Sequence, residues 1–165
     1  MGSIYQPTEN KVRLLQSEKT SFPRLGYLQS GNDNSDFEEG EFVGISSKSR
    51  GRLLVEKIKA GNYVAQAKNA LMRYRDTSND VLESGAITLQ KGFYELQTQL
   101  YVSGEAYQVG DLLTLRVEDS TGVLGPVESG TTTHVLARVD VPPTDSSENT
   151  PMQVTVFPTA RELNT

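Results

Sequence analysis

Alternation of apolar and polar residues most constrains the fold of this chain. Residues 93–102 and 135–141 place apolar side chains at every second position. Successive side chains of a strand point to opposite faces, so each stretch predicts a strand with one buried face. The residues that share one face are Tyr94, Leu96, Thr98, Leu100 and Val102 in the first strand, and Val135, Ala137, Val139 and Val141, which alternate with Leu136, Arg138 and Asp140, in the second.

Shorter β-rich stretches, separated by turn residues, surround these two strands. Val123-Leu124 is expected to form no more than an edge, and Pro158 is expected to end the last strand. Six or more short strands at about ten-residue spacing predict an all-β fold, a single compact β-barrel or β-sandwich. The further predicted strands cover residues 41–46, 51–58, 112–117 and 152–157.

Residues 60–76 fit two structures. Val64, Ala67 and Leu71 have helical spacing. Ala70, Met72 and Tyr74 would equally share one face of a strand. We favour a strand for residues 69–75, because every neighbouring segment has a β pattern.

The first forty residues have the least core-like sequence. We interpret residues 1–40 as an extended N-terminal arm, 41–160 as the β-domain and 161–165 as a C-terminal tail. The arm would pack on a neighbouring subunit or along its own barrel, and a frayed terminus is the further alternative. Its apolar residues are the candidate partner contacts, unless they pack on their own barrel: Tyr5, Val12, Leu14, Phe22, Leu25, Tyr27 and Phe37.

Few residues suited to catalysis are present. The chain has no cysteine and one histidine, His134, so zinc sites and nucleophilic triads have little to draw on. His134 opens a predicted strand and is interpreted as a half-exposed structural residue. No glycine-rich phosphate-binding motif is present. A pair of carboxylates for glycoside hydrolysis stays open as an alternative, because the distance between its members is set by the fold and not by sequence spacing. We therefore expect no catalytic residue, cofactor or metal, and a protein that is not an enzyme.

The acidic stretch 32–41 invites comparison with a calcium-binding loop. In an EF-hand register its sixth position is Phe37 instead of glycine, and its twelfth is Val43 instead of glutamate. A solvated acidic linker is the favoured interpretation, with a calcium loop left open.

The net charge of −5 disfavours two classes of partner. Sixteen lysines and arginines stand against 21 aspartates and glutamates. Nucleic acids and anionic membranes normally select a basic surface, so neither is an expected partner. Residues 72–75, Met-Arg-Tyr-Arg, resemble a stacking platform, but a strand with ion-paired arginines explains them as well. The first twenty residues lack the apolar stretch of a signal peptide, and no stretch is long enough to cross a bilayer.

The second half of the chain has a recognisable order of motifs. Tyr107-Gln-Val-Gly-Asp-Leu-Leu-Thr114 precedes a strand, and Val135-Leu-Ala-Arg-Val139 leads into Pro142-Pro143. Residues 38–43 open the series and residues 152–156 close it. Over about residues 38–158 the chain resembles the capsid decoration, or cement, proteins of tailed bacteriophages.

This resemblance implies a β-barrel or β-sandwich subunit on the exterior of the virion capsid, assembled in the host cytoplasm. The implied partners are the major capsid protein and further copies of the chain, with a trimer favoured over a dimer. The arm would reach across capsid subunits, so a chain lacking residues 1–36 is expected to fold and to lose capsid binding.

Other functions remain as alternatives. A tail-tube, tail-terminator or head–tail adaptor subunit would also use a small β-barrel, with the loop 69–85 as its polymerising element. A small trimeric β-barrel enzyme, such as a nucleotide hydrolase, has a similar size, but Gly110-Asp111 is better explained as a hairpin turn.

Overall fold

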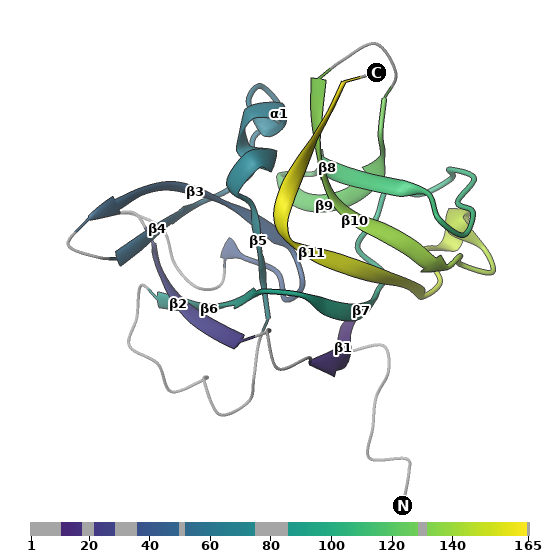
Figure 1. Cartoon of the computed structure of the whole chain (residues 1–165), viewed down its shortest axis with the longest axis horizontal. Helices are drawn as coiled ribbons and strands as arrows, with labels where there is room; N and C mark the ends of the chain where they lie inside the picture. The colour runs from purple at the N-terminus through teal and green to yellow at the C-terminus, as the bar shows by residue number, and fades with distance from the viewer. Residues whose placement is uncertain are drawn as a thin grey trace, which may run out of the picture.

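The computed structural model describes residues 11–17, 22–28, 36–49, 52–74, 86–128 and 132–164. Within them most regular structure is β, which confirms the predicted all-β class (Figure 1). The strands are β1 (Val12–Ser17), β2 (Phe22–Leu28), β3 (Phe42–Ser49), β4 (Arg52–Glu56), β5 (Leu71–Arg73), β6 (Ala86–Lys91), β7 (Tyr94–Thr98), β8 (Leu112–Glu118), β9 (Thr121–Pro126), β10 (Thr132–Val141) and β11 (Met152–Asn164).

Five of these strands close into a small barrel, in the order β3-β4-β2-β6-β5. Pairing of Phe42 with Met72 in β5 completes the circle. Strand β2 lies between β4, to which it is parallel, and β6, to which it is antiparallel. Figure 1 shows this five-strand barrel on the left of the molecule.

The other six strands form a curled sheet in the order β1-β7-β11-β10-β8-β9. The segment that follows β7 returns to β9, where the Val102 N–H donates to the Leu124 carbonyl at 2.8 Å. This six-strand sheet meets the barrel where Phe42 in β3 pairs with Gly122 in β9.

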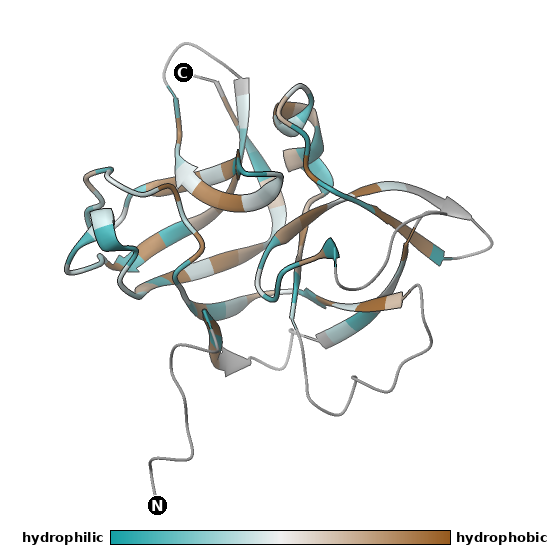
Figure 2. Cartoon of the chain, turned by 180° about the vertical axis from the view of Figure 1, so that it is seen from behind, coloured by the Kyte–Doolittle hydropathy of each residue, from teal (hydrophilic) through white to brown (hydrophobic). Residues whose placement is uncertain are grey.

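Each body has a buried core of its own. The barrel core consists of Val43, Leu53, Val55, Ile87 and Leu89 together with Phe37. The larger core lies within the six-strand sheet and extends to the junction. Figure 2 shows apolar and polar segments alternating along the strands, the pattern of a sheet with one buried face. In β7 the alternation is confirmed, because Tyr94, Leu96 and Thr98 are buried and their neighbours are half-buried.

The ambiguous stretch contains both kinds of structure. The helix α1 (Tyr63–Gln66) continues into a 3₁₀ turn (Ala67–Asn69), and β5 follows. The predicted strand is thus confirmed for residues 71–73 and wrong for residues 69, 70 and 74, whereas residue 75 lies outside the described residues. The buried Gln66 side chain holds the helical turns in place, because its amide donates to the Lys57 carbonyl and accepts from the Lys59 N–H, both at 3.0 Å.

Two strand predictions are wrong. Strand β11 continues past Pro158 to Asn164, so residues 161–164 pair with the start of β10 and do not form a tail. The β10–β11 register shifts between Val135 and Ala137, which places Pro158 where the ladder needs no N–H donor. Strand β9, expected only as an edge, lies between β8 and β3.

Candidate functional site

The N-terminal segment is part of the fold. Strand β1 pairs with β7, and β2 fills the gap between β4 and β6. The arm of residues 1–40 was expected to pack on a neighbouring subunit or along its own barrel, and in these two stretches it packs on its own fold.

The candidate contact residues have different environments. Val12 and Phe37 are each 3% exposed and belong to the two cores, so both pack on their own fold and are not free for a partner. Leu14 is half-buried against the larger core. Tyr27 is half-buried, with the Arg52 guanidinium 4.5 Å from its ring centre.

Two of the remaining three candidates are known by their strand pairing, and the third lies outside the described residues. In β2, Phe22 is paired with Lys91 and Leu25 with Thr88. Tyr5 lies outside the residues that the structure describes.

Strand β1 ends the strand order and has one unpaired edge among the described strands. The Gln99 N–H donates to the Lys11 carbonyl at 2.8 Å, which fixes which main-chain groups face β7. Because these groups alternate along an antiparallel strand, those of Arg13 face β7 and those of Val12 and Leu14 face outward. This edge presents main-chain donors and acceptors to a partner strand.

The acidic stretch ends in a buried ion pair. Glu41 is fully buried, and the Lys57 ammonium lies 2.9 Å from its Oε2 and 3.0 Å from its Oε1. The same ammonium donates to the Asp36 carbonyl at 2.9 Å and lies 5.1 Å from the centre of the Phe37 ring. The solvated-linker interpretation is therefore wrong for Phe37, Gly40 and Glu41, which are buried, whereas Asp36 is exposed and residues 32–35 lie outside the described residues.

Desolvation raises the pKa of Glu41 above its usual value, against the lowering effect of Lys57 and of the Glu38 and Gly122 N–H groups. This carboxylate is fully buried and already accepts hydrogen bonds from the Glu38 N–H and the Lys57 ammonium. It is a structural group that joins β3, β4 and β9. The described residues contain no cluster of three or more acidic or histidine side chains placed to hold a metal.

His134 lies in β10, opposite Glu162 in β11. Its imidazole is 17% exposed, with Nε2 3.9 Å from Glu162 Oε2, and its buried Nδ1 has no hydrogen-bond partner. Neither nitrogen faces a serine within hydrogen-bond distance among the described residues. This partly covered position agrees with the structural interpretation.

The Met-Arg-Tyr-Arg stretch offers no exposed stacking surface over its described part. Met72 is fully buried, and Arg73 and Tyr74 are half-buried. The Arg73 guanidinium donates to the Phe37 carbonyl. Arg75 lies outside the described residues.

A cleft of about 370 Å³ separates the barrel from β11. Its lining mixes apolar and polar residues; it includes Lys68 and Lys91 and, among the described residues, no acidic side chain. Sequence reasoning missed this cleft, because distant segments supply its wall and no local motif marks it. The remaining lining consists of Ile45, Ser46, Leu53, Asn69, Ala70, Leu71, Pro158, Thr159 and Ala160.

No protein-family model matches the chain, and no curated protein matches it significantly. No helix among the described residues is long and apolar enough to cross a membrane.

Proposed function

We propose that this chain is a non-enzymatic phage virion protein that binds the outside of the capsid and stabilises the mature shell. The proposal includes the major capsid protein as partner and self-association of the chain on the shell. A protein that binds only the mature lattice stabilises it by its binding free energy. Many equivalent sites then give high avidity even where each contact is weak.

The unpaired edge of β1 is the observation that supports this proposal best. A capsid strand that added to β1 would gain main-chain hydrogen bonds along its length, and its side chains would pack beside Leu14, which is half-buried at this edge. The order of motifs in residues 38–158 gives the proposal its specific class of partner.

The test compares binding of two variants to mature capsids that lack the protein. Leu14→Pro removes an outward N–H and leaves the bonds of Arg13 to β7 in place. Leu14→Val keeps that N–H and is the matched control. In co-sedimentation, Leu14→Val is expected to bind as the parent chain does, and Leu14→Pro to bind at least about tenfold more weakly.

Equal binding by both variants, each folded by circular dichroism, would refute strand addition at β1. The copy number per purified particle tests the wider proposal. Hundreds of copies in fixed ratio to the shell protein agree with decoration, whereas six to a few tens would assign the chain to the tail or its connector.

A further inference from the structure

Two regions of the sequence have opposite net charge, and the positive surplus of the barrel itself is reduced by the four carboxylates of residues 36–41, which adjoin its core at Phe37. Residues 42–92, which include four of the five barrel strands, contain nine lysines and arginines and four aspartates and glutamates. Residues 93–165, which form five strands of the curled sheet, contain three lysines and arginines and ten aspartates and glutamates. The first region thus has a net charge of +5 and the second of −7. Opposite charge on separate surfaces favours association between copies.

The positive region contains the cleft described above. Neither Lys68 nor Lys91 has an ion-pair partner within the part of the chain that the structure describes. Both therefore stand beside the apolar residues of the lining, Ile45, Leu53 and Leu71 among them, without an ion-pair partner among the described residues. A ligand with an apolar tip and an acidic surround complements this lining.

The negative region presents such a tip. Val109 is 72% exposed, the largest value among the exposed large apolar residues of the described chain. Val141, which is 48% exposed, follows two residues after Val139, whose carbonyl accepts a hydrogen bond from the Gly110 N–H at 2.8 Å, so the segments that carry the two exposed valines are bonded to each other. Glu105 and Asp111 flank Val109 in sequence. We call the turn 105–111 together with Val141 the knob.

The knob is held rigidly. The Tyr107 hydroxyl donates to the Val102 carbonyl at 2.6 Å, and its ring packs edge-on against Tyr101 with centres 5.3 Å apart. Asp111 accepts a hydrogen bond from the Gln108 N–H at 2.9 Å, which closes the turn. A preorganised turn loses little conformational entropy on binding. The Arg138 guanidinium, a cation in the same negative region, forms an ion pair with Asp140, with its Nη2 atom 3.3 Å from Oδ1.

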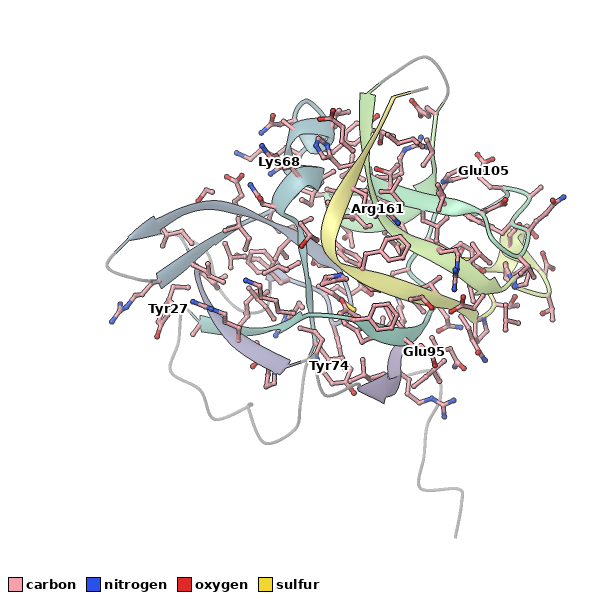
Figure 3. All side chains as sticks on the ribbon, in the orientation of Figure 1. Tyr27, Lys68, Tyr74, Glu95, Glu105 and Arg161 are labelled. Atoms are coloured by element: carbon pink, nitrogen blue, oxygen red, sulfur yellow. The ribbon has the colours of Figure 1, made fainter. Side chains whose placement is uncertain are left out.

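We infer that the knob of one copy binds in the cleft of a second copy, head to tail. Figure 3 places Lys68 beside the helical turns and Glu105 at the far end of the curled sheet, so one molecule presents the two surfaces in different places. Such a contact is heterologous and builds a ring or a filament, according to the rotation between copies. This inference rests on the self-association included in the proposed function.

The experiment uses two variants that each disable one surface. Lys68→Glu/Lys91→Glu reverses the charge of the cleft and keeps the knob, and Val109→Arg disables the knob and keeps the cleft. In sedimentation velocity each variant alone is expected to be monomeric where the parent chain assembles, with association at least about tenfold weaker. A mixture of the two keeps one usable interface and is expected to form dimers only.

Two substitutions outside these surfaces serve as controls. Lys59→Glu and Val64→Arg change exposed residues of the same kinds, and neither residue lines the cleft. Both are expected to assemble as the parent chain does. The parent assembly is also expected to dissociate between about 50 and 500 mM salt, because the interface joins opposite charges.

A parent chain that stays monomeric at about 100 µM, or a variant mixture without dimers, would overturn the inference. So would loss of assembly in the controls to the same extent. Every measurement uses the purified full chain without capsids. Failure of the knob-and-cleft contact is therefore distinguishable from failure of capsid binding.

Discussion

The junction between the barrel and the curled sheet depends on the absence of a side chain at Gly122. A Cβ atom at this position would lie 2.1 Å from the Phe42 carbonyl oxygen and 2.7 Å from Ile58 Cγ1. Contacts below 3.0 Å are essentially never seen for a Cβ, and the carbonyl is fixed in the β3–β9 pair. We therefore expect Gly122→Ala to force the two strands apart.

Two costs follow from this displacement. Overpacking of a rigid site costs about 1–3 kcal/mol. The Gly122 N–H also bonds the buried Glu41 carboxylate, and weakening a hydrogen bond to a buried charge costs about 1–3 kcal/mol. The expected loss is about 2–6 kcal/mol, a large part of the stability of a domain this size.

Urea unfolding followed by circular dichroism measures this loss. Gly61→Ala is the matched control, because a Cβ there meets no atom within 4 Å. Its effect is expected to stay within about 0.5 kcal/mol. If Gly122→Ala unfolds with a free energy within about 0.5 kcal/mol of the parent chain, the β3–β9 contact is not the fixed junction described here.

Three further outcomes are expected. The raised pKa of Glu41 means that the native state keeps its proton where the unfolded chain has lost it, so stability falls as pH rises from about 4.5. The difference in unfolding free energy between Glu41→Gln and the parent chain is thus expected to shift in favour of the variant from pH 4 to 7 in urea titrations. A shift in favour of the parent would show that the pairing with Lys57 outweighs desolvation in setting the pKa of Glu41. Tyr101→Phe removes the hydrogen bond of 2.5 Å from the Tyr101 hydroxyl to the Thr150 carbonyl and is expected to cost about 1 kcal/mol in urea unfolding. An unchanged free energy of unfolding would indicate that water replaces the hydroxyl at the Thr150 carbonyl. In hydrogen exchange, amides of β4 and β6 are expected to open at lower free energy than those of β10 and β11, because the barrel core is the smaller one. Equal protection would contradict separate cores.

The strands with a local signal could be predicted from the sequence. Residues 94–98 alternate because the strand has one buried face, and such alternation is visible in any single strand. The closure of the barrel leaves no comparable pattern within any single strand. Parallel pairing of β2 with β4 depends on contacts between residues far apart in the chain, such as Gly26 with Leu53.

The environment of the charged residues also depends on contacts between residues far apart in the chain. Glu41 belongs to an acidic run, and composition alone assigns such a run to solvent. Its burial follows from Lys57, sixteen residues later, whose ammonium reaches it across the start of β3. The cleft has no local signal either, because Lys68 and Lys91 line one cleft only after the barrel closes.

The position of β2 changes what a truncation would do. A chain without residues 1–36 was expected to keep its barrel, but this deletion removes the strand between β4 and β6. It exposes two sheet edges and the barrel core, where Gly26 lets Val55 and Leu89 approach the β2 backbone closely. The truncated chain is therefore expected to lose the cooperative folding of the barrel. Loss of capsid binding by that chain would report unfolding, so only a substitution at the outward edge of β1, such as Leu14→Pro, separates binding from folding.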